Sequence, residues 1–494
     1  MSDALRVAAL ARPDAPALDD GVRVWTYAEL DAAVGRMARR LTPLGAGPGS
    51  TVALAAHPGV LSIQAVWAIP RTGAVLVPLN PRLGAASLER ALDVTGPALI
   101  LSTERDVGDV ELDADWMTTL DDLPKPVGEA GESPVMAPGS GPSAIEPEPG
   151  AMTEPAPGAT TEPELGPVAL LWTSGTSGDP SAVPILASAL EASARASVVR
   201  LGLTERDRWY ASLSLGHVGG LALVHRAAYV GCTLLVRGRF SVEVLAELIG
   251  QEGLTHASLV PTMLSRLLDL RGGEPVPSTL RCLLIGGASA SGALVPSALE
   301  RGYSVALTYG LTEACSQVAT APPALVEEKP GTVGLPMDGL ELRIEEDGEI
   351  CVRGGTVSPS TTDGAGWLRT GDLGRLDDDG HLWISGRISD RIVTGGATVN
   401  PRSVESVLEG LPGVSAAAVA GLPDDVWGEV VVAVIVPDPG VEVDSTTLMA
   451  RAGERLSASE VPRRLQFADE LPLNTNGKID RGAVRAVFLS ASPA

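Results

Sequence analysis

Short apolar runs alternate with helical stretches along most of the chain. The runs fall at 51–56, 74–80, 98–102, 168–172, 231–236, 256–260, 281–287 and 304–310. One helix start is explicit, because Thr26-Tyr27-Ala28-Glu29 has the pattern of a capping box and an apolar face follows it. That face holds Leu30, Val34, Met37, Ala38 and Leu41. The alternation predicts an α/β fold in which helices cover parallel-rich sheets.

The pattern changes at Gly339, where short strands and turn signals replace the alternation. Asp347-Gly348 and Asp379-Gly380 each stand between apolar stretches, and this dipeptide is typical of type I′ hairpins. We expect a small β-barrel-like part here. A smaller α+β unit follows, with helices at 403–411 and 446–457, strands at 416–422 and 430–436, and a loop at 471–481. The sequence therefore predicts domains at 1–386 and 387–494, with a hinge at 387–390.

Residues 124–166 interrupt the large domain with a different composition. They are rich in Pro, Gly, Ala, Ser and Glu, and no basic residue occurs between Lys125 and Arg195. Such a segment cannot bury a core, so we predict a flexible surface insertion. A docking tail is the alternative.

Composition excludes several classes of protein. A net charge of −24 argues against a nucleic-acid partner, since phosphate-backbone binding needs a basic surface. The cysteines Cys232, Cys282, Cys315 and Cys351 are widely spaced, which is typical of reduced thiols and not of a zinc site. We see neither a signal peptide nor an apolar run of membrane-spanning length, so we expect a cytoplasmic protein. The oligomeric state stays open.

The loop after the run at 168–172 is the strongest chemical signal. Thr173-Ser174-Gly175-Thr176-Ser177-Gly178 combines hydroxyls with glycines, whose flexibility lets backbone N–H groups turn toward a polyphosphate. The loop is not a Walker motif, because no Gly-Lys-Ser/Thr closes it. We expect a helix-like segment after it. An ordinary Ser/Gly turn would look the same in isolation.

Four further motifs follow in chain order, and each has a plain structural alternative. Gly287 and Ala288 end an apolar run where a flat base could lie against the backbone, although a tight turn would look alike. Tyr309-Gly310-Leu311-Thr312-Glu313 offers a ring to stack on a base and a carboxylate suited to Mg²⁺, or else a core tyrosine and a helix cap. Asp372 and Arg387 could bind ribose hydroxyls or form a surface ion pair. Lys478 could serve a reacting phosphate or be an ordinary solvated lysine.

Together and in this order, the five motifs resemble those of the adenylate-forming (acyl-CoA synthetase) superfamily over nearly the whole chain. The resemblance implies ATP, CoA and Mg²⁺ as substrates and cofactor, and a reaction through an acyl-adenylate. It implies catalytic roles for Lys478, Thr312 and Glu313, with Glu313 also binding the metal. It implies that the nucleotide is bound by Thr173 to Gly178, Gly287, Ala288, Tyr309, Gly310, Asp372 and Arg387. Where relatives carry a loop lysine this chain has Ser181, which predicts a raised KM for ATP.

Segments 215–221, 255–264 and 308–320 are most similar to the o-succinylbenzoate–CoA ligases of menaquinone biosynthesis. This likeness implies an acyl site at His217, Ser316 and Gln317, and a hinge and CoA tunnel at Ser389, Gly395 and Gly396. His217 could equally be a half-buried structural histidine, and His225 and His256 are interpreted as structural. The alternatives are a benzoate- or anthranilate-type CoA ligase of secondary metabolism, an enzyme that charges a carrier protein, and a catalytically impaired binding protein.

Overall fold

The computed structural model describes residues 3–83, 85–102, 117–119, 123, 166–173, 181–251, 253–290, 293–474 and 478–490. Within these ranges the strands form four sheets. The predicted insertion at 124–166 lies outside the described residues, apart from Gly166. The described α-helices are α1 (Ala4–Ala11), α2 (Tyr27–Leu41), α3 (Val60–Arg71), α4 (Ala85–Thr95), α5 (Ala187–Leu201), α6 (Val218–Val230), α7 (Val242–Gln251), α8 (Pro261–Arg271), α9 (Leu294–Glu300), α10 (Pro323–Glu328), α11 (Pro401–Glu409), α12 (Ser445–Gly453) and α13 (Arg481–Ser490). Short 3₁₀ turns are η1 (Thr42–Leu44), η2 (Thr312–Ala314), η3 (Pro359–Thr361) and η4 (Ile388–Asp390).

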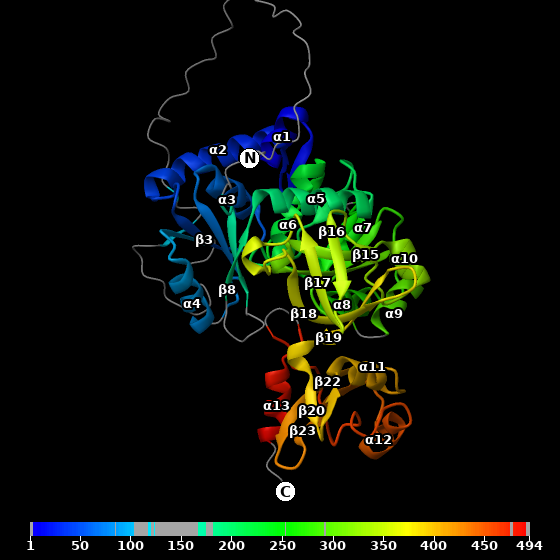
Figure 1. Cartoon of the computed structure of the whole chain (residues 1–494). Helices are drawn as coiled ribbons and strands as arrows, with labels where there is room; N and C mark the ends of the chain where they lie inside the picture. The colour runs from blue at the N-terminus through cyan, green and yellow to red at the C-terminus, as the bar shows by residue number, and fades with distance from the viewer. Residues whose placement is uncertain are drawn as a thin grey trace, which may run out of the picture.

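Two large sheets form the first part of the molecule (Figure 1). Every apolar run predicted from the sequence is a strand in one of them. In order across the sheet, the nine-stranded one contains β15 (Leu335–Pro336), β14 (Ser316–Ala321), β13 (Val305–Leu311), β12 (Cys282–Ile285), β11 (His256–Leu259), β9 (Arg208–Tyr210), β10 (Thr233–Leu235), β1 (Pro16–Asp19) and β2 (Val24–Thr26). The six-stranded one contains β6 (Met117–Thr119), β5 (Leu99–Ser102), β3 (Thr51–Ala55), β4 (Val75–Leu79), β7 (Ala169–Thr173) and β8 (Ser181–Ile185).

Helices cover both faces of both sheets. Side chains of α1, α2, α3, α5 and α6 share one core with strands of the two sheets, so these helices lie between them. Helices α7, α8 and α9 pack on the outer face of the nine-stranded sheet, and α4 packs on the outer face of the six-stranded one. Central strands are thus buried on both faces, which explains why they are continuous apolar runs in the sequence. The predicted α/β fold is confirmed, and so is the capping box, since Thr26 and Glu29 cap α2 reciprocally.

The segment after the phosphate-type loop differs from the prediction. A helix-like segment was expected, but β8 pairs antiparallel with β7 and α5 begins only at Ala187. The sequence Ser-Ala-Val-Pro-Ile alternates in burial, and its proline is tolerated because β8 lies at the sheet edge. Among the residues described after the loop, the chain therefore begins with a strand, and no helix starts before Ala187.

A four-stranded antiparallel sheet packs on the end of the nine-stranded one, through residues of β13 and β14. It contains β16 (Leu340–Ile344), β17 (Glu349–Gly354), β18 (Leu368–Leu376) and β19 (Leu382–Arg387). The two predicted hairpins are present, but their type I′ assignment is wrong. Only Gly348 and Gly380 have positive φ, at 86° and 79°, whereas type I′ needs two such residues. Asp347 and Asp377 each accept the backbone N–H two residues further on, at 3.1 Å, which favours an Asx-type turn closed by the glycine.

The last part of the chain forms a smaller unit below the two large sheets (Figure 1). Its sheet contains β21 (Ala397–Val399), β20 (Ile392–Thr394), β23 (Gly428–Pro437) and β22 (Val414–Asp424), and β24 (Arg464–Phe467) pairs with β23. Helices α11 and α12 cover one face of this sheet and α13 covers the other. Among the described helices of the whole chain, none has the length and apolar character that crossing a membrane requires.

Candidate active site

A tyrosine, a carboxylate and a guanidinium form the rigid centre of the candidate site. Tyr309, on β13, donates from its hydroxyl to Asp372 Oδ2 at 2.8 Å, and Arg387 Nε donates to Asp372 Oδ1 at 2.6 Å. Burial and the nearby carboxylate hold the pKa of Tyr309 well above its usual value, so the phenol stays protonated and donates. Burial alone would lower the pKa of the Arg387 guanidinium. The attraction of the Asp372 carboxylate is the larger effect, so the pKa of Arg387 is raised. Register keeps the pair together, since Asp372 and Arg387 are direct partners across β18 and β19.

Lys478 reaches this centre from the C-terminal unit. Desolvation and the Arg387 charge lower the pKa of its ammonium, while the carboxylates of Asp372 and Glu313 oppose the shift. The residue as a whole keeps contact with solvent. Glu313 and its neighbour Thr312 lie in η2, directly after the strand that carries Tyr309. The structure thus brings together side chains that are up to 169 positions apart in the sequence (Tyr309 to Lys478).

An arginine at the start of α13 anchors the loop that carries Lys478. Arg481 donates to Asp390 Oδ2 at 2.8 Å and to Glu405 Oε1 at 2.6 Å. Asp390 belongs to η4, the predicted hinge, and Glu405 is fully buried on α11. The backbone of Lys478 is held too, because its N–H donates to Asn474 Oδ1 at 3.1 Å. The position of the lysine is therefore mechanically tied to the hinge.

The turn after Glu313 is strained and close-packed. Cys315 and Ser316 have φ of 51° and 98°, an uncommon region for residues other than glycine. The Ser316 carbonyl comes so near Gly310 that a Cβ there would lie 1.9 Å from the oxygen, so position 310 requires glycine. Strain of this kind is characteristic of functional sites. On the neighbouring strand end Gly287 is exposed with φ of 79°, and Ala288 follows it half-buried.

The flanks of the phosphate-type loop are described, whereas Ser174, Gly175, Thr176, Ser177 and Gly178 lie outside the described residues. Thr173 Oγ1 lies 3.4 Å from both the carbonyl and the hydroxyl oxygen of Ser181. Ser358 links this region to η2, because its hydroxyl donates to the Pro184 carbonyl at 3.0 Å and its N–H donates to the Glu313 carbonyl at 2.7 Å. Strand β8, which follows the loop in the sequence, is therefore tied through Ser358 to the turn that carries Glu313.

The predicted acyl residues lie around α6. His217 is the N-cap residue of α6, and its Nε2 lies 3.3 Å from Asn80 Nδ2. The Gln317 amide is fully engaged within the protein. Its oxygen accepts from Ser197 and, at 2.9 Å, from Arg226, and its nitrogen donates to Thr320 at 2.7 Å and more weakly to Thr308.

Arg226 is a buried cation in contact with the predicted acyl residue Gln317, and the sequence analysis did not single it out. It is 2% exposed, and its guanidinium lies 5.2 Å from the centre of the Trp209 ring. In the part of the chain that the structure describes, its Nε has no hydrogen-bond partner. Burial lowers its pKa to about 10, and the ionisable groups around it are the thiols of Cys232, Cys282 and Cys315. Those thiols are free and neutral, since burial raises the pKa of each to about 12. The signal in the sequence was a single arginine in a helix that is apolar apart from His225 and Tyr229.

The predicted hinge and tunnel residues lie within eight positions of one another in the sequence, at the start of the C-terminal unit. Ser389 lies in η4, and its hydroxyl is 3.4 Å from Asp390 Oδ1. Gly395 and Gly396 form the two-residue turn between β20 and β21, with φ of 57° and 82°. A Cβ on Gly395 would lie 2.6 Å from the ring of Trp427, so this turn packs tightly on an aromatic side chain.

Fold and site together define a class of nucleotide-dependent enzyme, in which a lysine of the C-terminal unit comes under the influence of carboxylates from the first part of the chain. Residues 5–360 match the AMP-binding enzyme family and residues 403–478 match its C-terminal domain. The chain belongs to the AMP-binding enzyme family.

Several relatives are similar over nearly their full length. The 2-succinylbenzoate–CoA ligase of Geobacillus kaustophilus is 33% identical, with 99% of this chain and 98% of the relative covered. The ligase of the same description from Bacillus subtilis is 32% identical, with coverage of 93% and 92%. The solved o-succinylbenzoate CoA synthetase of Bacillus subtilis with its acyl-adenylate intermediate has a TM-score of 0.82 at 31% identity, covering 98% of both chains. An amide bond synthetase from Marinactinospora thermotolerans has a TM-score of 0.80 at 26% identity, covering 98% of this chain and 100% of that one.

Proposed function

We propose that this protein is an AMP-forming acid–thiol ligase that converts 2-succinylbenzoate, ATP and CoA into 2-succinylbenzoyl-CoA, AMP and pyrophosphate. The observation that carries the proposal is the meeting of Lys478 with Glu313, Asp372 and Arg387 in one site. The 2-succinylbenzoate–CoA ligase relatives support the choice of acid.

In the first step a carboxylate oxygen of the acid attacks the α-phosphorus of ATP. A new C–O–P linkage forms, the α–β phosphoanhydride bond breaks, and pyrophosphate leaves. The ammonium of Lys478 would offset negative charge between the carboxylate and the α-phosphate, which is where such charge stabilisation is most effective. Glu313 would hold Mg²⁺ together with phosphate oxygens, because this ion prefers one or two protein carboxylates. Bound magnesium supplies charge neutralisation of the leaving pyrophosphate.

The nucleoside would lie against the rigid centre of the site. Tyr309 would flank the adenine with Gly287 and Ala288 at the opposite strand end. Asp372 is held by two donors, and each of its oxygens retains a further lone pair for a ribose hydroxyl. Arg387 would fix the carboxylate in that orientation. Residues 173–178 would hold the outer phosphates.

In the second step the thiol of CoA attacks the acyl carbonyl, a C–S bond forms, AMP leaves, and the thiol proton passes to solvent. Lys478 occupies the approach in the first step, so we propose that residues 387–494 rotate about Ser389 between the two steps. The tether from Arg481 to the hinge residue Asp390 would move Lys478 with this unit. The Gly395–Gly396 turn would then line the tunnel for the pantetheine arm.

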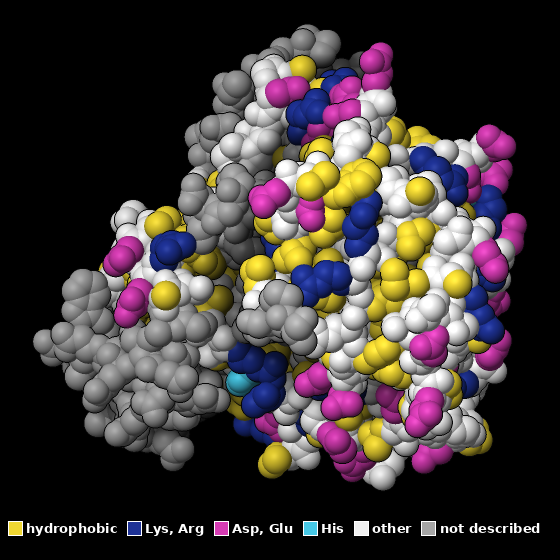
Figure 2. Space-filling model, turned by 90° about the horizontal axis from the view of Figure 1, so that it is seen from below, with side chains coloured by type: hydrophobic (Ala, Val, Ile, Leu, Met, Phe, Trp, Pro, Cys, Tyr) yellow, Lys and Arg dark blue, Asp and Glu magenta, His cyan; other side chains and the backbone are white. Residues whose placement is uncertain are grey.

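A cluster of three exposed arginines fits the phosphates of CoA. Burial and the charges of Arg239 and Arg266 lower the pKa of Arg82, so each of these two guanidiniums repels that of Arg82. Repulsion of this kind is relieved by a polyanion. On the face that Figure 2 shows, basic side chains are interspersed among acidic and apolar ones, and the acidic excess of the chain is not gathered into one patch there.

The second carboxylate of 2-succinylbenzoate needs a cation in the acyl pocket, and Arg226 supplies one. Its guanidinium has an unused Nε–H and an otherwise apolar surrounding. Gln317 holds it in place, so we propose that Gln317 positions Arg226, while Ser316 and His217 line the pocket near the reacting carboxylate.

A substrate panel tests the function. We expect pyrophosphate release and CoA-dependent AMP formation with 2-succinylbenzoate, at a kcat/KM at least about 100-fold above those for benzoate and anthranilate. Mass spectrometry of the product identifies the thioester. Pyrophosphate release without a thioester would argue against CoA as acceptor. A preference for benzoate or anthranilate would support the alternative aryl-acid ligase, and no pyrophosphate with any acid would indicate a binding protein.

Ser181→Lys restores the cation that relatives carry beside the phosphate loop. Ser181 is exposed at the start of β8, so the longer side chain can reach outer phosphates without disturbing the core. We expect the KM for ATP to fall about three- to tenfold with little change in kcat, as befits a solvent-screened contact. Ser181→Gln adds length without charge and is the matched control. An unchanged or higher KM in the lysine variant would contradict the idea.

A further inference from the structure

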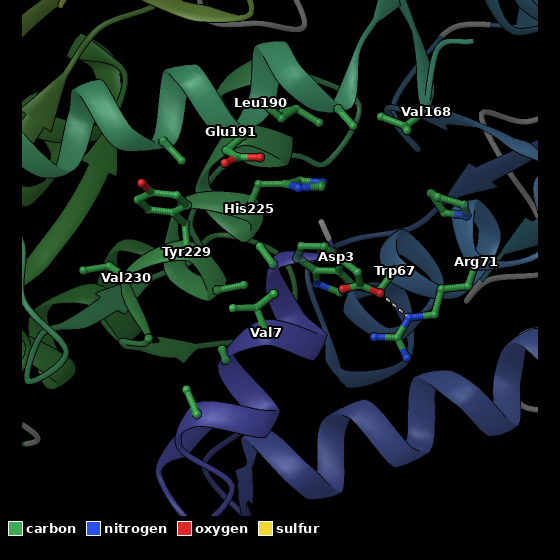
Figure 3. Close-up of a pocket in the computed structure, with 18 of the residues that line it drawn as sticks. Asp3, Val7, Trp67, Arg71, Val168, Leu190, Glu191, His225, Tyr229 and Val230 are labelled. Atoms are coloured by element: carbon green, nitrogen blue, oxygen red, sulfur yellow. Dashed lines mark hydrogen bonds and ion pairs between the residues drawn. The ribbon is translucent and has the colours of Figure 1, made fainter. Parts of the chain in front are cut away.

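A cavity of about 580 Å³ lies apart from the candidate site, enclosed by helices of the first part of the chain. Helix α1 forms its lower wall, α5 its upper wall, and α3 and α6 its sides (Figure 3). Its volume is within the usual range for small-molecule sites. None of its lining residues is among those assigned to the nucleotide, acyl or CoA sites.

The walls of the cavity are mainly apolar and aromatic. Trp67 and Leu190 are buried, whereas Val7 and Tyr229 are 55% and 39% exposed and form a rim open to solvent. Figure 3 shows Trp67 and His225 on the inner wall and Tyr229 at the edge. A flat ring entering between these side chains would be covered on several sides, and aromatic contacts favour flat aromatic ligands.

The charged groups at the cavity are balanced. Arg71 donates from Nε to Asp3 Oδ2 and from Nη2 to Asp31 Oδ1, each at 2.5 Å. Arg12 points to the Gly231 carbonyl, and Glu191 lies on the upper wall. Because these two cations are already matched by carboxylates and a carbonyl, an anionic ligand would gain little here. A neutral ligand is favoured.

His225 supplies the specific polar group. Its ring centroid lies 4.4 Å from that of Trp67, at an interplanar angle of 45°. Among the described residues, none hydrogen-bonds to its ring nitrogens. Desolvation lowers the pKa of His225 to about 4, so at neutral pH the imidazole has one donor and one acceptor nitrogen. A hydroxyl group can serve either nitrogen.

We propose that this cavity is a second small-molecule site, which binds a neutral, flat aromatic compound carrying a hydroxyl group. The ring lies between Trp67, Leu190 and the rim, and the hydroxyl hydrogen-bonds to His225. The site and the acyl pocket share helix α6, since His225 faces the cavity while its neighbour Arg226 contacts Gln317.

Calorimetric titration of the full chain with 2-naphthol tests this site. The titration is performed with saturating AMP and 2-succinylbenzoate, which exclude the probe from the nucleotide and acyl sites. We expect one bound 2-naphthol with a dissociation constant on the order of 100 µM, as the size of the probe allows. Absence of binding up to the solubility limit, or binding that disappears when AMP and the acid are added, would overturn the proposal.

Two variants and one control locate the probe. Val7→Trp fills the cavity from its exposed rim without overpacking the core, and we expect at least about tenfold weaker binding. His225→Phe keeps the contact with Trp67 but removes the ring nitrogens, and we expect about fivefold to tenfold weaker binding. Val199→Trp changes another exposed valine, which lies on α5 outside the cavity, and this variant should bind as the wild type does. Unchanged binding by Val7→Trp would place the probe elsewhere, and unchanged binding by His225→Phe would refute the hydroxyl contact.

Discussion

Replacement of Lys478 by alanine is expected to slow acyl-adenylate formation by about 10²- to 10³-fold. The charges of Glu313, Asp372 and Arg387 all act on the ammonium, which in the proposed first step offsets the negative charge that develops between the acid and the α-phosphate. Removal of one preorganised donor at such a place typically has an effect of this size. Pyrophosphate release with 2-succinylbenzoate and ATP measures it directly.

The two half-reactions separate this role from a general loss of structure. Thioester formation from separately prepared acyl-adenylate and CoA should change less than about threefold in Lys478→Ala, because the proposed rotation takes the lysine out of the site in that step. Lys329→Ala is the matched control, since Lys329 is tied to Asp377 and Asp379 on a hairpin turn and should not affect either half-reaction. An equal loss in both half-reactions would mean that Lys478 holds the structure together and does not act on the phosphate.

Part of the arrangement of the motif residues follows from short distances along the chain. Tyr309 and Glu313 are close in sequence, and Asp372 and Arg387 are partners in one hairpin, so local rules place them. Lys478 could be assigned only through the family resemblance. Its approach depends on Arg481, Asp390 and Glu405, which join three elements of the C-terminal unit.

Local rules failed where tertiary contacts decide the outcome. Residues Ser181–Ile185 form a strand because they pair with β7 at the edge of the sheet. The sequence of these five residues alone does not indicate that pairing. The turn at Asp379-Gly380 is stabilised by the side chain of Asp377, which accepts the N–H of Asp379. The prediction of a type I′ turn considered only the Asp-Gly dipeptide. The cavity is enclosed by four helices from distant parts of the chain, and no local pattern encodes it.

Arg226 was not identified from the sequence because its contact with Gln317 joins distant parts of the chain. Replacement of Arg226 is expected to have the second large effect. Arg226→Met keeps most of the apolar volume but removes the guanidinium. We expect kcat/KM for 2-succinylbenzoate to fall by on the order of 10²-fold or more, mainly through KM, since loss of one partner of a buried charge pair weakens binding strongly. The KM for ATP should stay within about twofold, because Arg226 contacts Gln317 and Trp209 and not the nucleotide residues.

Arg271→Met gives the matched control for the removal of a buried guanidinium. Arg271 is 5% exposed, and its Nη1 likewise has no hydrogen-bond partner, but its contacts are with Glu274 and Pro275 at the end of α8. We expect this variant to lose stability without a change in the KM for the acid. A comparable KM for the acid in Arg226→Met and the wild type would show that the second carboxylate binds elsewhere. The buried arginine would then be structural. Its role would be to contact Trp209 and Gln317, whose amide oxygen also accepts from Ser197.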